Sequence, residues 1–487
     1  MKILLINPPV FNDVGRCKSD SPPLALLYLA GYLEKHGYSD VRVLDADQAE
    51  LTWQALGDLL VEENPDIVGI GGSSYLLPAL VKTADVARRH LANCLIVTGG
   101  FGPTKEPEKV LKAGNRAVNF VVMGEGEMTL LEIVRRRESQ VKDFNDMAGL
   151  AFLDGDDNLV LTKPREYIMD LDSVPWPAFH LLSPGFSKYP GAPMNKEMWK
   201  PRATIVAARG CPHRCTFCSM GSKLYRQRSP KDIVEEMEFY KNKFGVKSVQ
   251  IYDDEFIGMS PKQNEWIKEI CNEMIKRDLR LPWLVQGRCS QFVDLETLKK
   301  MKEAGCIWIW WGVESGSQKV LDNIHKDIKI EDVCRAFALA KEADIKSLMF
   351  LMVGLPSQTP ADVKMSIDLI KKVKPDNVGI HITTPFPGSE LRRYLQANNL
   401  LDVTLDNLAD YYKLDTDRHI HHHTFEMTTA EIVQYFKLLV FSYKHSPWYF
   451  IKFGFKSLST VDGWKELSKR IKIMINYFSG WLKMNFS

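Results

Sequence analysis

The amino-acid sequence predicts an α/β fold with two successive sheet-containing units and a helical C-terminal tail. The first unit is expected to be a doubly wound parallel sheet, and the second a partial (β/α)6 barrel. Short apolar runs, mostly β-branched, alternate with helix-length segments across residues 1–138 and again across 201–400. Such runs are typical of strands buried on both faces. A chain of 487 residues is long enough for both units.

Composition excludes several classes of protein. Hydrophobic residues make up 45% and charged residues 25% of the chain, and the net charge is +2. These values are ordinary for a globular protein and argue against a nucleic-acid partner. Six of the nine cysteines are scattered and suggest no disulfide framework, and a strand-like run directly after Lys2 argues against a cleavable signal, so we expect a reducing, cytoplasmic location. No run of about 18 apolar residues predicts a membrane-spanning helix.

Residues 1–138 are predicted to form five βα units. Strands are expected at 2–6, 41–44, 67–70, 95–98 and 120–123, and helices near 24–36, 51–63, 76–91, 106–113 and 127–137. Ligands of such sheets bind beyond the carboxyl ends of the strands, where glycine lets the backbone approach a large ligand closely. The candidate binding residues at these ends are Ser73, Ser74, Gly99, Gly100, Gly124, Glu125 and Gly126. Glycines needed only for tight turns are the alternative interpretation.

Residues 139–200 are predicted to bridge the two units. A hairpin is expected over 149–163 around Asp154-Gly155-Asp156. The proline-containing segment 171–179 favours extended chain, and a rigid linker is its preferred role.

Residues 201–400 are predicted to form the partial barrel. Strands are expected at 204–208, 248–253, 283–287, 307–313, 347–354 and 377–383, and helices near 230–243, 262–277, 295–304, 331–342 and 360–373. Six strands are too few to close as an eight-stranded barrel does, so a lateral gap should remain for a bulky substrate. Active sites of parallel barrels lie at the carboxyl ends of their strands.

Three cysteines follow the first barrel strand in the stretch GCPHRCTFC. Cys211, Cys215 and Cys218 can converge on one soft-metal centre, and their spacing differs from the paired Cys-x2-Cys units of zinc sites. Iron–sulfur clusters are usually held by four thiolates, so three would leave one iron open. His213 and Arg214 favour the thiolate form. The alternative is three loop cysteines that are buried or hold zinc.

Polar residues close the other barrel strands. They are Asp253, Asp254 and Glu255 after the second strand, Arg288 after the third, Glu314 and Ser315 after the fourth, and Gly354 and Pro356 after the fifth. Carboxylates can bind an ammonium group, and arginine can bind a carboxylate or hydroxyl group in a fixed geometry. For each acidic residue, a helix cap or a surface position is the competing interpretation.

These motifs together resemble the radical S-adenosylmethionine (SAM) superfamily. The resemblance implies that Cys211, Cys215 and Cys218 hold a [4Fe-4S] cluster whose open iron binds SAM. The stretch 252–256 is similar to the family's motif for the SAM amino group, and 312–317 to its fourth-strand motif. Phe217 matches the aromatic residue beside the third cysteine, near adenine, and 385–389 resembles the sixth-strand adenine segment. The resemblance covers about residues 1–400, and the cysteine motif is its most specific part.

The N-terminal unit resembles the Rossmann-like cobalamin-binding domain that precedes many radical SAM barrels. The segments 99–104 and 123–127 carry this resemblance. One departure concerns the family's Asp-x-His-x-x-Gly motif, because the corresponding segment 45–50 contains no histidine. A lower-face histidine ligand to cobalt is therefore not expected. The departure also leaves open a domain that does not bind cobalamin.

The resemblance implies an oxygen-sensitive enzyme that cleaves SAM to a 5′-deoxyadenosyl radical and transfers a methyl group from cobalamin to an unactivated carbon. It also implies an external one-electron reductant of the flavodoxin or ferredoxin type. Cyclisation, oxidation or carbon–carbon coupling on a lipid or tetrapyrrole is the alternative. A non-catalytic iron–sulfur or cofactor-binding protein is a third interpretation. The sequence identifies no substrate, whether small or lipid-like.

Three further features remain open. The run His419 to His423 invites a metal site, although a solvated turn away from the cluster is preferred. Trp308 and Trp310 should face one side of their strand and Trp311 the other, with core packing preferred over a pocket wall. Residues 441–487 hold eight Lys or Arg, two Asp or Glu and twelve aromatics. A helix formed by this segment would either pack on the barrel or lie peripherally on the inner face of a membrane.

Overall fold

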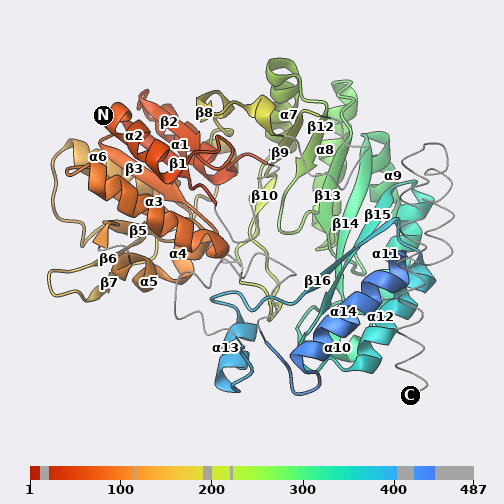
Figure 1. The fold of residues 1–487 in the computed structure, drawn as a ribbon. Helices are drawn as coiled ribbons and strands as arrows, with labels where there is room; N and C mark the ends of the chain where they lie inside the picture. The colour runs from red at the N-terminus through yellow and green to blue at the C-terminus, as the bar shows by residue number, and fades with distance from the viewer. Residues whose placement is uncertain (11–20, 114–115, 190–199, 220–222, 403–421, 445–487) are drawn as a thin grey trace, which may run out of the picture.

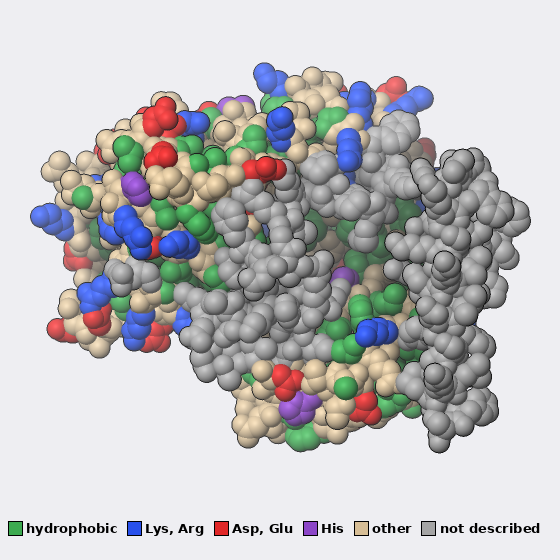
Figure 2. Space-filling view, viewed as in Figure 1, with side chains coloured by type: hydrophobic (Ala, Val, Ile, Leu, Met, Phe, Trp, Pro, Cys, Tyr) green, Lys and Arg blue, Asp and Glu red, His purple; other side chains and the backbone are tan. Residues whose placement is uncertain are grey.

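The computed structural model describes residues 1–10, 21–113, 116–189, 200–219, 223–402 and 422–444. Two sheets, each flanked by helices, form the bulk of the molecule (Figure 1). The predicted two-unit α/β fold is therefore confirmed. Charged side chains of both signs are interspersed on the visible face of the N-terminal unit (Figure 2).

The N-terminal sheet contains the five predicted parallel strands. They are β1 (Ile3–Asn7), β2 (Val41–Asp45), β3 (Ile67–Gly71), β4 (Leu95–Gly99) and β5 (Phe120–Val122), in the order β5-β4-β3-β1-β2. The strand order changes direction between β1 and β3. A doubly wound sheet of this order binds its ligands at that point, beyond the carboxyl ends of the strands.

Three further strands extend this sheet. The hairpin β6 (Leu150–Leu153) and β7 (Leu159–Leu161) pairs antiparallel with β5, and β8 (Leu182–Ser183) pairs parallel with β2. The predicted hairpin is present, but it belongs to the N-terminal sheet instead of standing free in a bridge. A strand edge has unpaired backbone groups, and these additional strands satisfy them.

Helices cover both faces of the N-terminal sheet. α1 (Leu24–Lys35) and α6 (Glu127–Glu138) pack together, as do α2 (Trp53–Glu63) and α3 (Leu77–His90). The helix expected near 106–113 is instead two short helices, α4 (Phe101–Lys105) and α5 (Pro107–Lys112). Glu106 has φ −133°, and Pro107 cannot donate a backbone hydrogen bond, so one helix ends and another begins here.

The second sheet is an open, parallel, six-stranded barrel in the order β16-β15-β14-β13-β12-β9. Its strands are β9 (Arg202–Ile205), β12 (Ser248–Ile251), β13 (Trp283–Gly287), β14 (Cys306–Glu314), β15 (Lys346–Val353) and β16 (Asn377–Ile382). The strand expected at 204–208 ends early, because Ala208 and Arg209 form β10 (Ala208–Arg209), which pairs antiparallel with β11 (Arg226–Gln227).

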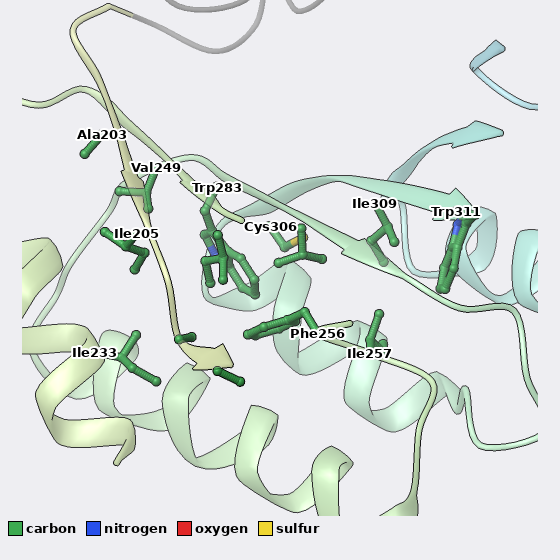
Figure 3. Close-up of a cluster of buried hydrophobic side chains, with 14 of the residues drawn as sticks. Ala203, Ile205, Ile233, Val249, Phe256, Ile257, Trp283, Cys306, Ile309 and Trp311 are labelled. Carbon is green, nitrogen blue, oxygen red and sulfur yellow. The ribbon is translucent and has the colours of Figure 1, made fainter. Parts of the chain in front are cut away.

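The barrel helices are α7 (Pro230–Phe244), α8 (Pro261–Lys276), α9 (Leu295–Glu303), α10 (Gln318–Asn323), α11 (Ile330–Glu342) and α12 (Pro360–Val373). Their apolar faces and the strands enclose the core drawn in Figure 3, which includes Trp283 and Trp311. Trp308 and Trp310 lie in a separate cluster on the other face of β14. The predicted alternation of the three tryptophans is confirmed.

The connecting segment contacts both units and is not fully extended. It contains 3-10 turns at Leu171–Ser173 and Phe179–Leu181. The Ala178 N–H donates to Leu27 O at 3.1 Å, and the Trp176 indole donates to Asp232 Oδ1 at 3.0 Å. The prediction of extended chain over 171–179 is therefore only partly correct. The two turns place this proline-containing segment between α1 and α7.

Within the part of the chain that the structure describes, two helices follow the barrel: α13 (Glu390–Ala397) and α14 (Thr429–Lys444). α14 packs against α12 and β16, and Tyr443 Oη donates to Asp376 O at 3.2 Å. Among the described helices, none combines the length and apolar composition needed to cross a membrane. Residues 445–487, which make up nearly all of the predicted basic and aromatic tail, lie outside the described residues.

Candidate functional site

The cysteine loop begins directly after β10, where Gly210 has φ +89°. Cys211 and Cys215 are half-buried and Cys218 is exposed. Thr216 anchors this loop, since its N–H donates to Ile324 O at 3.0 Å and its carbonyl accepts from Leu391 N at 2.8 Å. The end of α10 and the start of α13 therefore hold the loop at the carboxyl side of the barrel.

The first cysteine lies beside a carboxylate from the second barrel strand. Cys211 Sγ lies 3.8 Å from Glu255 Oε2, and His213 Nε2 lies 2.9 Å from the same oxygen. Among described His, Cys, Asp and Glu residues, only these three place ligand atoms within 4.8 Å of one another. The three thiols do not share this single-ion spacing; in a cluster they would bind different irons. Burial raises the pKa of Cys211 to about 12, so cluster binding must displace its proton.

Two acidic residues after β12 have buried oxygens without partners in the described structure. Asp253 Oδ1 accepts from Ala207 N at 2.8 Å, whereas Asp253 Oδ2 and Glu255 Oε1 accept nothing. Burial raises the pKa of Asp253 to about 8. Asp254 is exposed at the mouth of the barrel, where partial desolvation and then Glu255 raise its pKa. These atoms are available to a ligand with ammonium or hydroxyl donors.

The buried Asp253 carboxyl predicts a pH dependence of stability. Its folded pKa exceeds that of an unfolded aspartate, so the folded state retains a proton that the unfolded chain releases above about pH 4. The unfolding free energy of the cofactor-free protein should therefore fall between about pH 4 and pH 8, by up to about 1.4 kcal/mol per pH unit. Asp253→Asn should flatten this fall in urea titrations, and exposed Asp278→Asn should not. An unchanged slope in Asp253→Asn would contradict the assignment.

Arg288 supplies a buried cation at the end of β13. Its side chain is buried, and guanidinium Nη2 has no partner among the described residues. Gly258, at φ +106°, allows its loop to approach the Arg288 backbone closely, because a Cβ at this position would collide with Arg288 O. An unpaired buried guanidinium nitrogen and unpaired acidic oxygens at the ends of the neighbouring strands β13 and β12 fit a zwitterionic ligand such as the amino-acid part of SAM.

The fourth strand end carries a buried ion pair. Glu314 Oε1 lies 2.8 Å from Lys326 Nζ, and both side chains are about nine-tenths buried. Ser315 is fully buried, and its Oγ accepts from Ser317 N at 3.2 Å, which shapes the turn into α10. Lys326 belongs to no sequence motif, so it was not among the residues predicted for the site.

Gly354 and Pro356 lie in a turn, and other residues of the protein bind the backbone N–H and carbonyl of Gly354. The Gly354 N–H donates to Gln358 Oε1 at 2.9 Å, and the Gly354 carbonyl lies 2.6 Å from His422 Nε2. His422 is fully buried and burial lowers its pKa, so the predicted solvated turn away from the site is wrong for this residue. His423 is exposed beside Asp402, and 419–421 lie outside the described residues. The contacts favour a structural role for His422.

The loops after β3 and β4 pack backbone against backbone. Gly100, at φ +97°, would place a Cβ 2.8 Å from Gly72 O, and Gly102 would place one 2.6 Å from Ser73 O. The buried hydroxyls of Ser73, Ser74 and Thr98 have no partner in the described structure. Gly99 ends β4 and accepts from Gly72 N at 3.2 Å. Unpaired hydroxyls at these strand ends fit a large polar ligand.

The third loop, after β5, has both open and paired positions. Gly124 has φ +78°, and a Cβ added there would meet no atom within 4 Å, whereas a Cβ on Gly126 would contact Leu29 at 3.1 Å. Glu125 is bound by Arg226, whose Nη1 lies 3.0 Å from Oε2. Glu125 therefore has a structural role in addition to the ligand-binding role predicted for it.

The segment 45–50, which stands where the family has its histidine motif, is fixed by hydrogen bonds to other residues of the protein. Asp45 Oδ1 accepts from Asn7 Nδ2 at 2.9 Å, and Asp45 Oδ2 accepts from Tyr189 Oη at 2.7 Å. Asp47 and Gln48 are also buried. The side chains at the carboxyl end of β2 are thus occupied by hydrogen bonds within the protein.

Ion pairs join the β5 loop to the base of the cysteine loop. Arg209, two residues before Cys211, lies 2.7 Å from Glu127 and 3.5 Å from Glu125. Arg226 on β11 binds Glu125 through both guanidinium ends. These contacts bring the candidate binding loops of the two units next to one another.

Removing this connection predicts a loss of stability between the units. Arg226→Ala should cost about 2 kcal/mol, because it leaves the half-buried Glu125 without its principal partner. Calorimetry should show two separated melting transitions where the parent protein shows one. Arg280→Ala, which removes an exposed pair with Asp278, should change melting little. An Arg226→Ala melting profile identical to the parent would contradict the connection.

Comparison with known proteins matches two parts of the chain to protein families. Residues 13–134 match the B12 binding domain, and residues 205–370 match the radical SAM superfamily. An uncharacterized methyltransferase from Pyrococcus horikoshii is 30% identical over 431 residues, covering 88% of this chain and 89% of that protein. An anaerobic magnesium-protoporphyrin IX monomethyl ester cyclase from Rubrivivax gelatinosus is 30% identical, covering 80% of this chain and 69% of the relative.

Solved structures share the fold at lower identity. The radical SAM methyltransferase TsrM from Kitasatospora setae, with cobalamin and a [4Fe-4S] cluster bound, superposes with a TM-score of 0.71 at 18% identity. That match covers 91% of this chain and 92% of TsrM. The cobalamin-dependent SAM radical enzyme OxsB gives a TM-score of 0.74 at 18% identity and covers 97% of this chain and 71% of OxsB.

Proposed function

Because the chain belongs to the radical SAM superfamily and carries a B12-binding domain, we propose that it is a cobalamin-dependent methyltransferase. Its substrate would be a small or lipid-like molecule with an unactivated carbon. The contact between the β5 loop and the base of the cysteine loop carries this proposal. Methyl transfer requires both cofactors to reach one substrate carbon, and these ion pairs hold their candidate loops in register.

Each part of the site has a proposed binding role. Cys211, Cys215 and Cys218 would hold the [4Fe-4S] cluster, and Asp253, Asp254, Glu255 and Arg288 would bind the amino-acid part of SAM. Phe217, Glu314, Ser315, Gly354 and Pro356 would complete the SAM site. Ser73, Ser74, Gly99, Gly100, Gly124, Glu125 and Gly126 would contact cobalamin.

When bound, the cluster would supply the electron for SAM cleavage, and cobalamin would supply the transferred methyl group. The protein's own contribution is orientation. Thr216 anchors the cysteine loop to α10 and α13, and the unpaired atoms of Asp253 and Arg288 offer a carboxyl oxygen and a guanidinium nitrogen to a ligand at adjacent strand ends. Preorganised groups of this kind lower the entropic cost of bringing reactants together.

Cyclisation, oxidation or carbon–carbon coupling without methyl transfer is the second candidate function. The 30% identity to the protoporphyrin ester cyclase supports it. Cofactor content and product mass separate the two functions. Protein purified anaerobically with added cobalamin should contain both an iron–sulfur cluster and cobalamin, as judged by absorbance and by the mass of extracted cofactors. Protein that binds the cluster and no cobalamin would exclude cobalamin-dependent methyl transfer while leaving the radical SAM assignment intact.

We further propose that the reductant is a flavodoxin- or ferredoxin-type protein in the cytoplasm, and that residues 441–487 contact the inner face of the membrane. The eight basic and twelve aromatic side chains of that segment support membrane contact. Full-length protein should sediment with anionic liposomes more than a chain lacking residues 445–487. Equal sedimentation of the two proteins would contradict the proposed membrane contact.

A further inference from the structure

The end of β14 is shaped around one carboxylate. The pairing of β14 with β15 shifts register between Gly312 and Glu314, and Glu314 has φ +68°. Left-handed backbone is uncommon for residues other than glycine, and a register shift redirects the side chain that follows it. A Cβ on Gly312 would lie 2.9 Å from Lys326 Nζ and 3.0 Å from Glu314 Oε1, so glycine leaves room for this pair.

Lys326 is the partner to which Glu314 is turned. Its Nζ lies 2.8 Å from Glu314 Oε1 and 5.8 Å from the centre of the Phe217 ring. Phe217 stands between Cys215 and Cys218 in the sequence. The backbone of the same loop is fixed at the preceding residue, where Thr216 N donates to Ile324 O. Lys326 therefore touches both the cysteine loop and the end of the fourth strand.

The charges around Lys326 are unequal. Burial opposes the protonated form of Lys326, but Glu314 and then Cys215 outweigh it, so the pKa of Lys326 is raised despite the nearby Arg288. Lys326 is paired with Glu314, and the neighbouring cation Arg288 keeps an unpaired nitrogen among the described residues. A buried lysine is costly unless its charge is compensated, and an additional anion at this site would provide that compensation. The carboxylate of SAM and the negatively charged cluster are both anions of this kind.

We propose that Lys326 is a positioning residue for both barrel cofactors. It holds the Glu314 carboxylate at the SAM site, and its charge stabilises the reduced cluster, which carries one more electron. This inference rests on the proposed function, because it needs the cluster and SAM to bind where the cysteine loop and the strand ends place them. Reduction potentials of iron–sulfur clusters respond to local charge.

The test compares three variants of the anaerobically reconstituted full-length protein. Lys326→Met removes the charge, Lys326→Arg keeps it, and Lys319→Met removes the half-exposed α10 lysine that lies 3.4 Å from Asp362. Iron content and far-UV circular dichroism report folding and cluster assembly. The cluster's midpoint potential is measured by titration followed by electron paramagnetic resonance, and SAM affinity by the change that SAM causes in that spectrum.

Lys326→Met should assemble the cluster, with a midpoint potential more negative than the parent's and a Kd for SAM raised about tenfold or more. Lys326→Arg should restore most of the potential, and Lys319→Met should match the parent. A parental potential and a parental Kd in Lys326→Met would overturn the inference. If Lys326→Met does not assemble a cluster, Glu314→Gln is decisive: it should shift the potential to more positive values, and no shift would overturn the inference. A parent protein that assembles no cluster would instead contradict the proposed function.

Discussion

Replacing Cys215 with alanine is expected to abolish cluster assembly and with it the cleavage of SAM. Removing one of the three thiolates leaves one iron of the cluster without its protein ligand. Iron content should fall to background and 5′-deoxyadenosine formation should become undetectable. Folding should change little, because Cys215 is only half-buried.

Cys334→Ala is the matched control for that variant. Cys334 is also half-buried, but it lies on α11, outside the cysteine loop. It should retain parental iron content and SAM cleavage. Cobalamin binding should persist in both variants, since Cys215 and Cys334 belong to neither of the core clusters that pack the N-terminal sheet as buried residues. Full cluster content in Cys215→Ala would contradict the assignment of this cysteine as a ligand.

Replacing Gly102 with valine is expected to abolish cobalamin binding while leaving the cluster intact. A Cβ at Gly102 would lie 2.6 Å from Ser73 O and 2.9 Å from Ser74 Cα. Backbone atoms cannot rotate away as side chains do, so the Ser73–Ser74 loop must move, at a cost of about 1–3 kcal/mol. The protein should lose the absorbance of bound cobalamin and keep that of the iron–sulfur cluster.

Gly155→Val is the matched control for Gly102→Val. Gly155 lies at the tip of the β6–β7 hairpin, and a Cβ there would meet no atom within 4 Å. Cobalamin content in this variant should equal that of the parent. Parental cobalamin binding in Gly102→Val would show that the β3 and β4 loops do not form the binding site.

The sequence predicted the parallel strands well because each is a short, buried apolar run. β3 and β15, for example, fall within one or two residues of their expected bounds. Such runs exclude amphipathic surface helices on composition alone. The hairpin was predicted locally but not its place in the N-terminal sheet, because its pairing with β5 depends on a strand edge about 30 residues away.

Contacts between distant residues explain the rest of what the sequence did not reveal. Glu125 and Arg226 are separated by 101 positions, and neither lies in a motif that names its partner. Lys326 follows a short helix and has the sequence context of an ordinary surface lysine until folding turns Glu314 towards it. The cysteine spacing, by contrast, is local, so it was visible in the sequence.

The most direct test of radical SAM chemistry in this protein is the formation of 5′-deoxyadenosine by the full-length chain. The protein, reconstituted anaerobically with iron, sulfide and cobalamin, is incubated with SAM and a low-potential one-electron reductant, and the products are identified by mass spectrometry. We expect 5′-deoxyadenosine from the parent protein and none from Cys215→Ala. A parent protein with full cluster and cobalamin content that forms no 5′-deoxyadenosine would contradict the proposed chemistry.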